Sequence, residues 1–346
     1  MRVLDNLLRG KGLPSFKGMA NGDISVDVET ARRLYARCPV AKPTPLVSLN
    51  KLASDLGIAS IAAKDERQRM GLGSFKALGA AYALAKEAVA AGGDPATALT
   101  GRTYACASAG NHGISLATGA RLFGAVAVVY LSRTVPEVFA DRLRDKGATV
   151  LRVGADYEES LAAAMEESEK RGWYLLSDSS WEAYSDPPRD VMEGYLVMGA
   201  EAAEQIAAPP THVFLQAGVG GLAAAGAAMA RRAWGDAVKI VIVEPEAAPA
   251  LYRSIEAGRP VTAAGPVSIM GRLDCKEPSH LALKYLATEA DAFALVSERE
   301  GQEAAARLGD TGMPTTPSGA GGFAGLCGMR QPATRALIYV SEGPDA

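Results

Sequence analysis

The sequence predicts an α/β fold in which two parallel sheets are covered by helices, and three observations support this prediction. From about residue 100 onward, short apolar segments alternate with longer segments of helical spacing. The segment "AVAVVYL" at 125–131 is apolar throughout, as is typical of a strand buried on both faces. The chain has 346 residues, which is long for one simple core, so we expect one large domain or two linked domains.

Local patterns place the individual elements. A strand is expected at 103–108, followed by a helix over "GNHGISLATGARLFG" at 110–124. The strand at 125–131 leads into "PEVFADRLRDKG" at 136–147, a helix with proline at its start and glycine just past its end. Further strands are expected at 149–153, 173–177, 212–216, 238–243, 292–296 and 335–340, with helices at 156–172 and 190–206.

The composition argues against several classes of function. The net charge is −3 and the Lys and Arg residues are scattered, so we expect no nucleic-acid partner. The 4 cysteines are far apart and there are 3 histidines, so we expect no metal site. Free thiols fit a reducing cytoplasm, and the sequence predicts neither a signal peptide nor a membrane span.

Three loops that follow predicted strands carry polar or glycine-rich sequences, and ligands of parallel sheets bind at such loops. "SAGNHG" at 108–113 is either an anion site or a capped helix start. "QAGVGGLAAAG" at 216–226 lets backbone N–H groups approach a phosphate, is a plain tight turn, or is part of a dinucleotide site, although it lacks GxGxxG spacing. "SEGPDA" at 341–346 either offers the hydroxyl of Ser341 to a ligand or is a frayed C-terminus.

One lysine, Lys76, lies inside the apolar segment "GLGSFKALGAAYALA" at 71–85, which otherwise has the composition of a buried helix. Such a lysine snorkels to solvent, is paired, or is used chemically. Pyridoxal 5′-phosphate needs a reactive lysine, a phosphate cradle, a carboxylate loop and a hydroxyl partner together. Its aldehyde forms a Schiff base with lysine, and its ring stabilises amino-acid carbanions. The residues therefore indicate a pyridoxal-phosphate enzyme.

The sequence resembles the fold-type II (tryptophan-synthase β-like) pyridoxal-phosphate enzymes, and within them the diaminopropionate ammonia-lyase branch. The similar stretches follow the family order over nearly the whole chain: "DERQRMGLGSFKALGA" (65–80), "SAGNHG" (108–113), "DSSWEAYSDPPRDVMEGY" (178–195), "FLQAGVGG" (214–221) and "VEPEAAPALYRS" (243–254). The resemblance implies two α/β domains with the cofactor in the cleft between them. Residues 1–79 and 191–346 would form the large domain and 80–190 the small one.

The resemblance also implies roles for individual residues. Lys76 would carry the cofactor and take the Cα proton, and Asp178 would either act near the leaving amine or cap the following turn. Further cofactor contacts would come from Phe75, Asn111, Gly218, Val219, Gly220, Gly221, Leu222 and Ser341. The substrate carboxylate would lie at Ser108, Ala109, Asn111 and His112, although His112 could equally serve to order the loop.

Ala109 departs from the lyase branch, which commonly has an aspartate before the glycine of "GNH", thought to be a base for D-isomers. The form "SAGNH" is that of threonine and serine dehydratases.

The expected activity is a carbon–nitrogen lyase reaction, in which β-elimination from a small L-2-amino acid such as 2,3-diaminopropionate gives pyruvate and ammonia through aminoacrylate. A serine/threonine or hydroxyaspartate dehydratase is the alternative, and a non-catalytic cofactor-binding protein is a third hypothesis. A cytoplasmic homodimer is implied.

Overall fold

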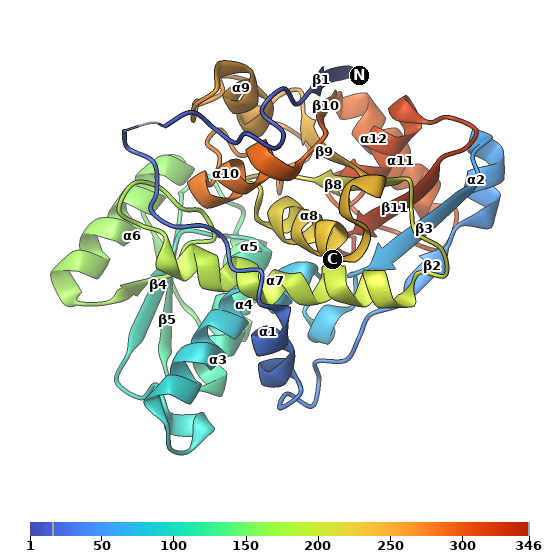
Figure 1. The fold of residues 1–346 in the computed structure, drawn as a ribbon. Helices are drawn as coiled ribbons and strands as arrows, with labels where there is room; N and C mark the ends of the chain where they lie inside the picture. The colour runs from blue at the N-terminus through green and yellow to red at the C-terminus, as the bar shows by residue number, and fades with distance from the viewer. Residues whose placement is uncertain (16, 345–346) are drawn as a thin grey trace.

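The computed structural model describes residues 1–15 and 17–344, and its larger sheet has seven strands in the order β1-β10-β9-β8-β11-β3-β2 (Figure 1). These strands are β1 (Arg2–Asp5), β2 (Leu46–Ser48), β3 (Ser60–Asp65), β8 (His212–Gln216), β9 (Lys239–Pro245), β10 (Ala292–Val296) and β11 (Arg335–Val340). The five central strands are parallel, whereas β1 and β2 at the edges are antiparallel to their neighbours.

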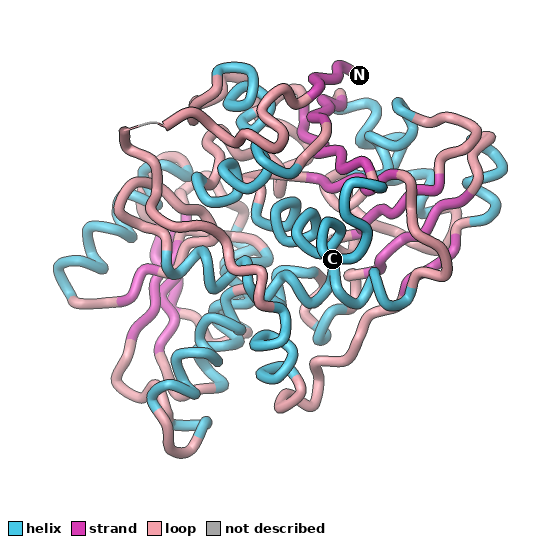
Figure 2. Tube along the Cα trace, viewed as in Figure 1, coloured by secondary structure: helices cyan, strands magenta, loops and turns pink. Residues whose placement is uncertain are grey.

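The smaller sheet has four parallel strands in the order β6-β5-β4-β7. Its strands are β4 (Thr103–Cys106), β5 (Val126–Leu131), β6 (Thr149–Arg152) and β7 (Tyr174–Leu175). Figure 2 shows them as a group separate from the larger sheet. The predicted α/β fold with two largely parallel sheets is confirmed.

The sequence patterns do not predict β1, β2 or β3, and they make β7 too long. A search for apolar runs does not find strand β3, because the strand contains two buried charged residues, Lys64 and Asp65. The segment predicted as a strand at 173–177 pairs as a strand only over Tyr174–Leu175. Beyond it, the Leu176 N–H still donates to the Ala105 carbonyl of β4, whereas the Leu176 carbonyl accepts from the His112 side chain.

Helices cover both faces of the larger sheet. Because side chains alternate along a strand, Val213 and Leu215 of β8 face the core that includes α8, whereas Phe214 faces a second core that includes α12. The helices are α1 (Val28–Tyr35), α2 (Asn50–Leu56), α3 (Ala80–Ala91), α4 (Asn111–Leu122), α5 (Glu137–Asp145), α6 (Tyr157–Arg171), α7 (Asp186–Gln205), α8 (Gly221–Trp234), α9 (Ala250–Ala257), α10 (His280–Glu289), α11 (Glu298–Gly309) and α12 (Gly321–Met329). Among the described residues, no helix combines the length and the apolar character needed to cross a bilayer.

The longest helix, α7, runs beside both parts of the fold (Figure 1). It packs against α8 of the larger sheet and against α3, which follows the 3₁₀ turn η2 (Phe75–Leu78) that carries Lys76. A Cβ on Gly194 would overlap the carbonyl oxygen of Leu78. Glycine at 194 therefore allows α7 to lie directly on the turn that holds Lys76.

A buried cluster of four charges lies beside the segment that leads to that turn. Arg69 Nη2 lies 2.7 Å from Glu66 Oε1 and 2.7 Å from Glu201 Oε2 of α7. Lys64 Nζ also lies 2.7 Å from Glu201 Oε2. Buried charges are tolerated when they are paired, and here two cations meet two carboxylates. The cluster joins β3 and the segment leading to Lys76 with α7.

We expect Arg69→Ala to lower the free energy of unfolding by about 3–5 kcal/mol, because it leaves the buried carboxylates of Glu66 and Glu201 short of a cation. Denaturant unfolding of the two proteins measures the difference. Arg299→Ala is the control: the Arg299 side chain is 85% exposed and pairs with Glu303, so a change below about 0.5 kcal/mol is expected. A loss below about 1 kcal/mol for Arg69→Ala would show that the cluster does not hold this region together.

Candidate active site

Lys76 lies in the short 3₁₀ helix η2, which Ser74 caps. Helix α3 begins only at Ala80, after Gly79. The Ser74 hydroxyl accepts a hydrogen bond from the Lys76 N–H at 3.3 Å, and the Phe75 N–H donates to the Ser341 carbonyl at 2.9 Å. The turn is therefore fastened to the residue that follows β11.

The topology explains why three distant loops meet here. Strand β11 pairs with β3 on one side and β8 on the other, all parallel, so their carboxyl ends share one edge of the sheet. The Lys76 turn follows β3, the glycine-rich loop follows β8, and Ser341 follows β11. Ser341 is buried, and the last two residues of the predicted 341–346 loop lie outside the described residues.

The side chain of Lys76 forms an ion pair with Asp178, which follows β7 of the smaller sheet. Burial alone would lower the pKa of Lys76, but the adjacent carboxylate outweighs it and raises the pKa well above its ordinary value. In turn, burial raises the pKa of Asp178, but the Lys76 ammonium has the larger net effect and holds that pKa far below its ordinary value. Asp178 thus contacts the lysine, and the next helix, α7, begins only at Asp186.

His112 lies behind Asp178 and is buried. Its Nε2 is 2.8 Å from the Leu176 carbonyl oxygen, and its Nδ1 is 4.0 Å from Asp178 Oδ2. Nδ1 has no hydrogen-bond partner among the described residues. Burial lowers the pKa of His112. His112 therefore holds the loop after β7 and borders the ion pair, and its contact with a substrate carboxylate stays a prediction.

The predicted carboxylate loop lies beside the end of β11. Helix α4 begins at Asn111 without a side-chain cap, which leaves its first N–H groups uncapped, and Ser108 and Ala109 precede it half-buried. Asn111 Nδ2 donates to Glu342 Oε2 at 2.6 Å. Glu342 is buried, also accepts from the Thr316 hydroxyl, and lies 2.9 Å from Arg272 Nε. The side chain of Glu342 thus links the start of α4, which belongs to the part of the fold with the smaller sheet, to the end of β11.

The glycine-rich loop forms a close cradle before α8. Gly220 has a φ of +105°, in the left-handed region that favours glycine, and α8 begins at Gly221 without a side-chain cap. A Cβ on Gly218 would lie 2.9 Å from Cys275 Sγ. Leu222 is buried, and the Val219 carbonyl accepts from the Ser279 N–H at 2.9 Å. Small residues and uncapped N–H groups are the features of an anion site.

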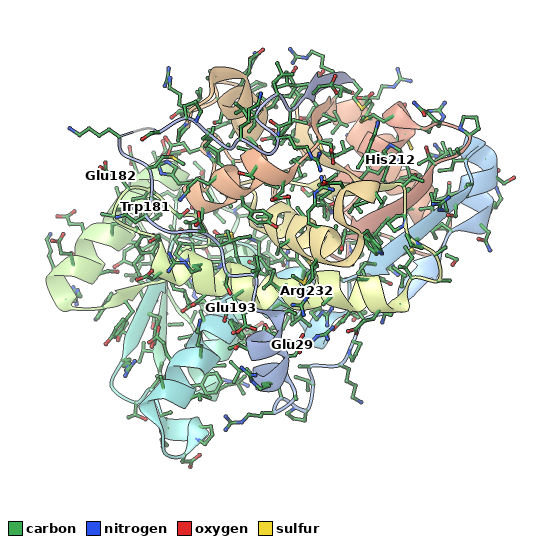
Figure 3. All side chains as sticks on the ribbon, viewed as in Figure 1. Glu29, Trp181, Glu182, Glu193, His212 and Arg232 are labelled. Carbon is green, nitrogen blue, oxygen red and sulfur yellow. The ribbon has the colours of Figure 1, made fainter. Side chains whose placement is uncertain are left out.

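The segment between Asp178 and α7 folds back on itself. The rings of Trp181 and Tyr184 stack with centroids 4.2 Å apart, and the Tyr184 hydroxyl donates to the Leu175 carbonyl at 2.9 Å. Figure 3 shows Trp181 and Glu182 on this segment and Glu193 on α7. Glu193 accepts from Lys86 Nζ at 3.1 Å and from the Tyr82 hydroxyl, so its observed contacts hold α7 to α3.

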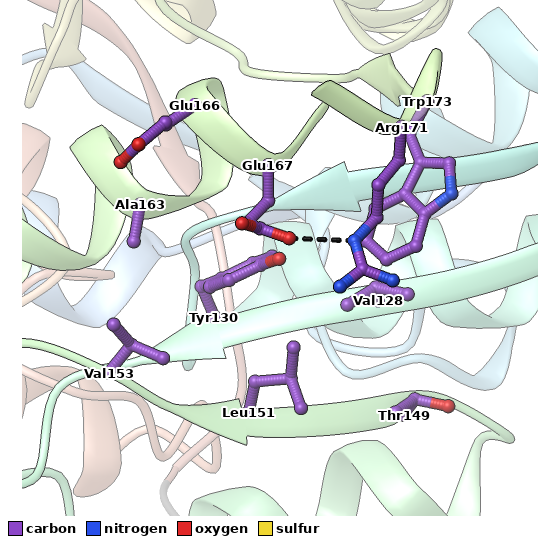
Figure 4. Close-up of a pocket in the computed structure, with 10 residues that line it drawn as sticks. All are labelled: Val128, Tyr130, Thr149, Leu151, Val153, Ala163, Glu166, Glu167, Arg171 and Trp173. Carbon is purple, nitrogen blue, oxygen red and sulfur yellow. Dashed lines mark hydrogen bonds and ion pairs between the residues drawn. The ribbon is translucent and has the colours of Figure 1, made fainter. Parts of the chain in front are cut away.

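A separate cavity of about 550 Å³ lies between α6 and the smaller sheet (Figure 4). Tyr130, Leu151 and Trp173 line it, and an ion pair between Arg171 and Glu167 at 2.7 Å crosses its side. None of its lining residues is among the candidate site residues.

Comparison with known proteins agrees with this arrangement. The family model described as "Pyridoxal-phosphate dependent enzyme" matches residues 38–340. The chain belongs to the family of pyridoxal-phosphate dependent enzymes. A diaminopropionate ammonia-lyase of Escherichia coli K12 is 33% identical over 285 residues, which cover 76% of this chain and 70% of that protein. An L-threonine ammonia-lyase of Geobacter sulfurreducens is 29% identical over 257 residues, covering 74% of this chain and 59% of that protein.

A solved structure is similar along almost the whole length. The crystal structure of the Escherichia coli diaminopropionate ammonia lyase, in complex with an aminoacrylate–pyridoxal-phosphate azomethine reaction intermediate, superposes with a TM-score of 0.86 at 28% identity. The match covers 99% of this chain and 93% of that one. Together the comparisons identify a pyridoxal-phosphate-dependent ammonia-lyase of the group that includes diaminopropionate ammonia-lyases and threonine dehydratases.

Two observations show that the residues present fit pyridoxal phosphate. The cradle at Gly218 has no room for a Cβ, and the helix that follows it begins without a side-chain cap. Beside the Lys76–Asp178 pair, the buried Nδ1 of His112 has no hydrogen-bond partner among the described residues. A buried polar atom without a partner indicates a ligand that the chain itself does not supply.

Sequence reasoning missed three residues at the site: Glu342, Tyr195 and Cys275. Glu342 directly follows Ser341, and its charge in a strand-end loop was a usable signal. Tyr195 ends the "DSSWEAYSDPPRDVMEGY" stretch but looks like an ordinary aromatic residue of a buried helix. Nothing local to Cys275 indicates that it packs against the glycine-rich loop, where burial raises its pKa to about 12 and keeps the thiol neutral.

We expect the His112 ring to be neutral at pH 7, with its proton on Nε2. Burial lowers the pKa of His112 below 6.5, and the Leu176 carbonyl can only accept a hydrogen bond. Two-bond ¹H–¹⁵N spectra can test this because the chain has 3 histidines, and His112→Gln assigns the signal. A ring with protons on both nitrogens at pH 7 would contradict the assignment.

Proposed function

We propose that this ammonia-lyase acts on 2,3-diaminopropionate or a closely similar L-2-amino acid. The observation that carries the proposal is the ion pair between Lys76 and Asp178, because it sets a carboxylate beside the lysine amine. A β-ammonium group of the substrate can take the place of the lysine ammonium at Asp178. A hydroxyl leaving group, as in serine, carries no such charge.

The proposed chemistry assigns one role to each group. Pyridoxal phosphate supplies the electron sink for the charge left at Cα. Lys76 holds the cofactor at rest and takes the Cα proton, and the Asp178 carboxylate holds the β-ammonium group, which already carries the proton with which it leaves as ammonia. The released 2-aminoacrylate then hydrolyses, so that diaminopropionate and water give pyruvate and two ammonia molecules.

The remaining residues are proposed to bind and orient. The N–H groups of Gly218, Val219, Gly220, Gly221 and Leu222 would hold the phosphate, and Ser341 would meet the pyridine nitrogen. Phe75 would pack beside the cofactor, and Asn111 would meet its 3′-oxygen. Ser108, Ala109, Asn111 and His112 would receive the substrate carboxylate. Support comes from the uncapped starts of α4 and α8.

The division into a large domain (1–79 and 191–346) and a small one (80–190) is also proposed, because the four strands of the smaller sheet all lie within 80–190. The homodimer and the cytoplasmic location stay predictions.

A second candidate function is a serine/threonine or hydroxyaspartate dehydratase. Ala109 favours it, because the loop then has the form "SAGNH" typical of those enzymes.

The two candidates differ in what Asp178→Asn does. For a diaminopropionate lyase, Asn at 178 loses the charge that binds the leaving ammonium, and hydrogen bonds to charged groups are the strong ones. We measure kcat/KM for L-2,3-diaminopropionate and for L-serine by pyruvate release. In Asp178→Asn, we expect the first value divided by the second to be about ten- to hundredfold lower than in wild type. Wild-type protein should release two ammonia per pyruvate from diaminopropionate. Wild-type protein that turns over L-serine or L-threonine faster than diaminopropionate, with a ratio that Asp178→Asn leaves unchanged, would favour the dehydratase.

Ala109 predicts a preference for L-substrates. Lys76 can serve one face of Cα, whereas the methyl group of Ala109 cannot accept a proton on the other. Because a positioned base contributes ~10²–10⁴ in rate, wild type should prefer L- over D-diaminopropionate by at least about a hundredfold. Ala109→Asp should raise D-isomer turnover selectively, with Ala109→Asn as the control that has a similar shape and no basic carboxylate. Equal wild-type rates on both isomers would refute this role for Ala109 and point to Asp178 as the second base.

A further inference from the structure

The segment that carries Asp178 is held by one buried serine, Ser180. Ser180 is 1% exposed, and Ser279, the residue before α10, is fully buried. The two hydroxyl oxygens lie 2.8 Å apart, and the Ser279 hydroxyl accepts from the Ser180 N–H at 3.1 Å. The Leu281 N–H donates to the Ser180 hydroxyl at 2.8 Å, and the His280 N–H donates to the Ser180 carbonyl at 2.9 Å. All three polar groups of Ser180 therefore bind the start of α10.

These bonds connect the Asp178 segment with the glycine-rich loop. Helix α10 begins without a side-chain cap from Ser279, and the Ser180 hydroxyl supplies that cap from another part of the chain. The Ser279 N–H donates to the Val219 carbonyl at 2.9 Å, and α10 packs against α8. The Asp178 segment is thus joined to the part of the fold with the larger sheet, although Asp178 itself follows a strand of the smaller sheet.

Asp178 lies between two anchors in the chain. Two residues before it, Leu176 is bound to His112 and to β4 of the smaller sheet. Two residues after it, Ser180 is bound to α10. The partner of Asp178, Lys76, stands on the turn that is fastened to the end of β11 in the larger sheet. Of the two anchors, the one at Ser180 belongs to the same part of the fold as Lys76, so it is suited to fix the carboxylate relative to the lysine.

Asp178 supplies the charge that sets the proton affinity of Lys76. The Tyr195 hydroxyl and the Cys275 thiol also act on the lysine, but burial raises the pKa of both groups, so they carry no charge at pH 7. Burial lowers the pKa of His112, so its ring is neutral as well. The Asp178 carboxylate therefore raises the pKa of Lys76, and a displacement of the carboxylate would lower it.

We propose that Ser180 is a positioning residue, which holds the Asp178 carboxylate against Lys76 by binding its segment to α10. The backbone bonds of Ser180 do not depend on its side chain, whereas the bonds of its hydroxyl do. With alanine at 180, the Leu281 N–H loses its buried partner, and the cost of leaving it unpaired favours a shift of the segment that lets another group or water reach it. The proposal concerns the contact between Asp178 and Lys76 and holds for either amino-acid substrate.

Ser180→Ala tests the proposal in the holoenzyme, because it removes the hydroxyl and leaves the backbone bonds. The carboxylate beside the lysine nitrogen stabilises its protonated form, so the pH at which the near-visible absorbance of the bound cofactor changes reports where the carboxylate lies. We expect Asp178→Asn to lower this midpoint by about 1–3 pH units and Ser180→Ala to lower it by at least about 0.5 unit. Ser279→Ala, which removes the partner hydroxyl, should act in the same direction. In the Asp178→Asn protein, the further change Ser180→Ala should shift the midpoint by less than about 0.3 unit, because no charge remains to be displaced.

Ser254→Ala on α9 is the matched control, because it also removes a fully buried hydroxyl that both donates and accepts. The Ser254 hydroxyl donates to the Ala250 carbonyl at 2.7 Å and accepts from the Val261 N–H at 3.0 Å. Both variants should lower the Tm of the holoenzyme, but Ser254→Ala should leave the midpoint unchanged. A midpoint that Ser180→Ala leaves unchanged, an equal shift in Ser254→Ala, or an undiminished effect of Ser180→Ala in the Asp178→Asn protein would each overturn the proposal.

Discussion

The contact between Lys76 and Asp178 is the interaction on which the site depends, because it joins the two sheets at the point where chemistry is expected. Lys76 stands on a turn fastened to the end of β11, and Asp178 follows β7 of the smaller sheet. Each charge holds the other in its ionised form. Any ligand that takes Lys76 into a covalent bond must leave Asp178 with another partner, and a substrate ammonium is suited to that place.

The surroundings fix the two groups from opposite sides. On the side of Lys76, Arg69 and its buried carboxylate partners link α7 with the segment that leads to the turn. Gly194 allows that helix to lie against the turn. Beyond Asp178, His112 anchors the loop that bears it. Asn111 and Glu342 connect α4 with the end of β11. The site is thus held by contacts between residues that are far apart in the sequence.

That long range also explains what the sequence could predict. Apolar runs such as 125–131 predict the buried parallel strands and the loops that follow them. Strand β3 escapes prediction because Lys64 and Asp65 are buried in it. Whether Asp178 capped a helix or met Lys76 could not be decided locally, because the answer depends on a residue 102 positions away. Glu342 and Tyr195 were missed for the same reason, because their place at the site depends on contacts with residues that are far away in the sequence.

The claim that Lys76 is the residue at which the cofactor is held can be tested directly on the purified holoenzyme. Borohydride reduction fixes the cofactor to the amine that carries it, and proteolysis with mass spectrometry then locates the labelled lysine. The account predicts that the label lies on the peptide containing Lys76 and that Lys76→Ala protein, treated in the same way, acquires none. A label on any other lysine of the wild-type protein, including the buried Lys64, would contradict it.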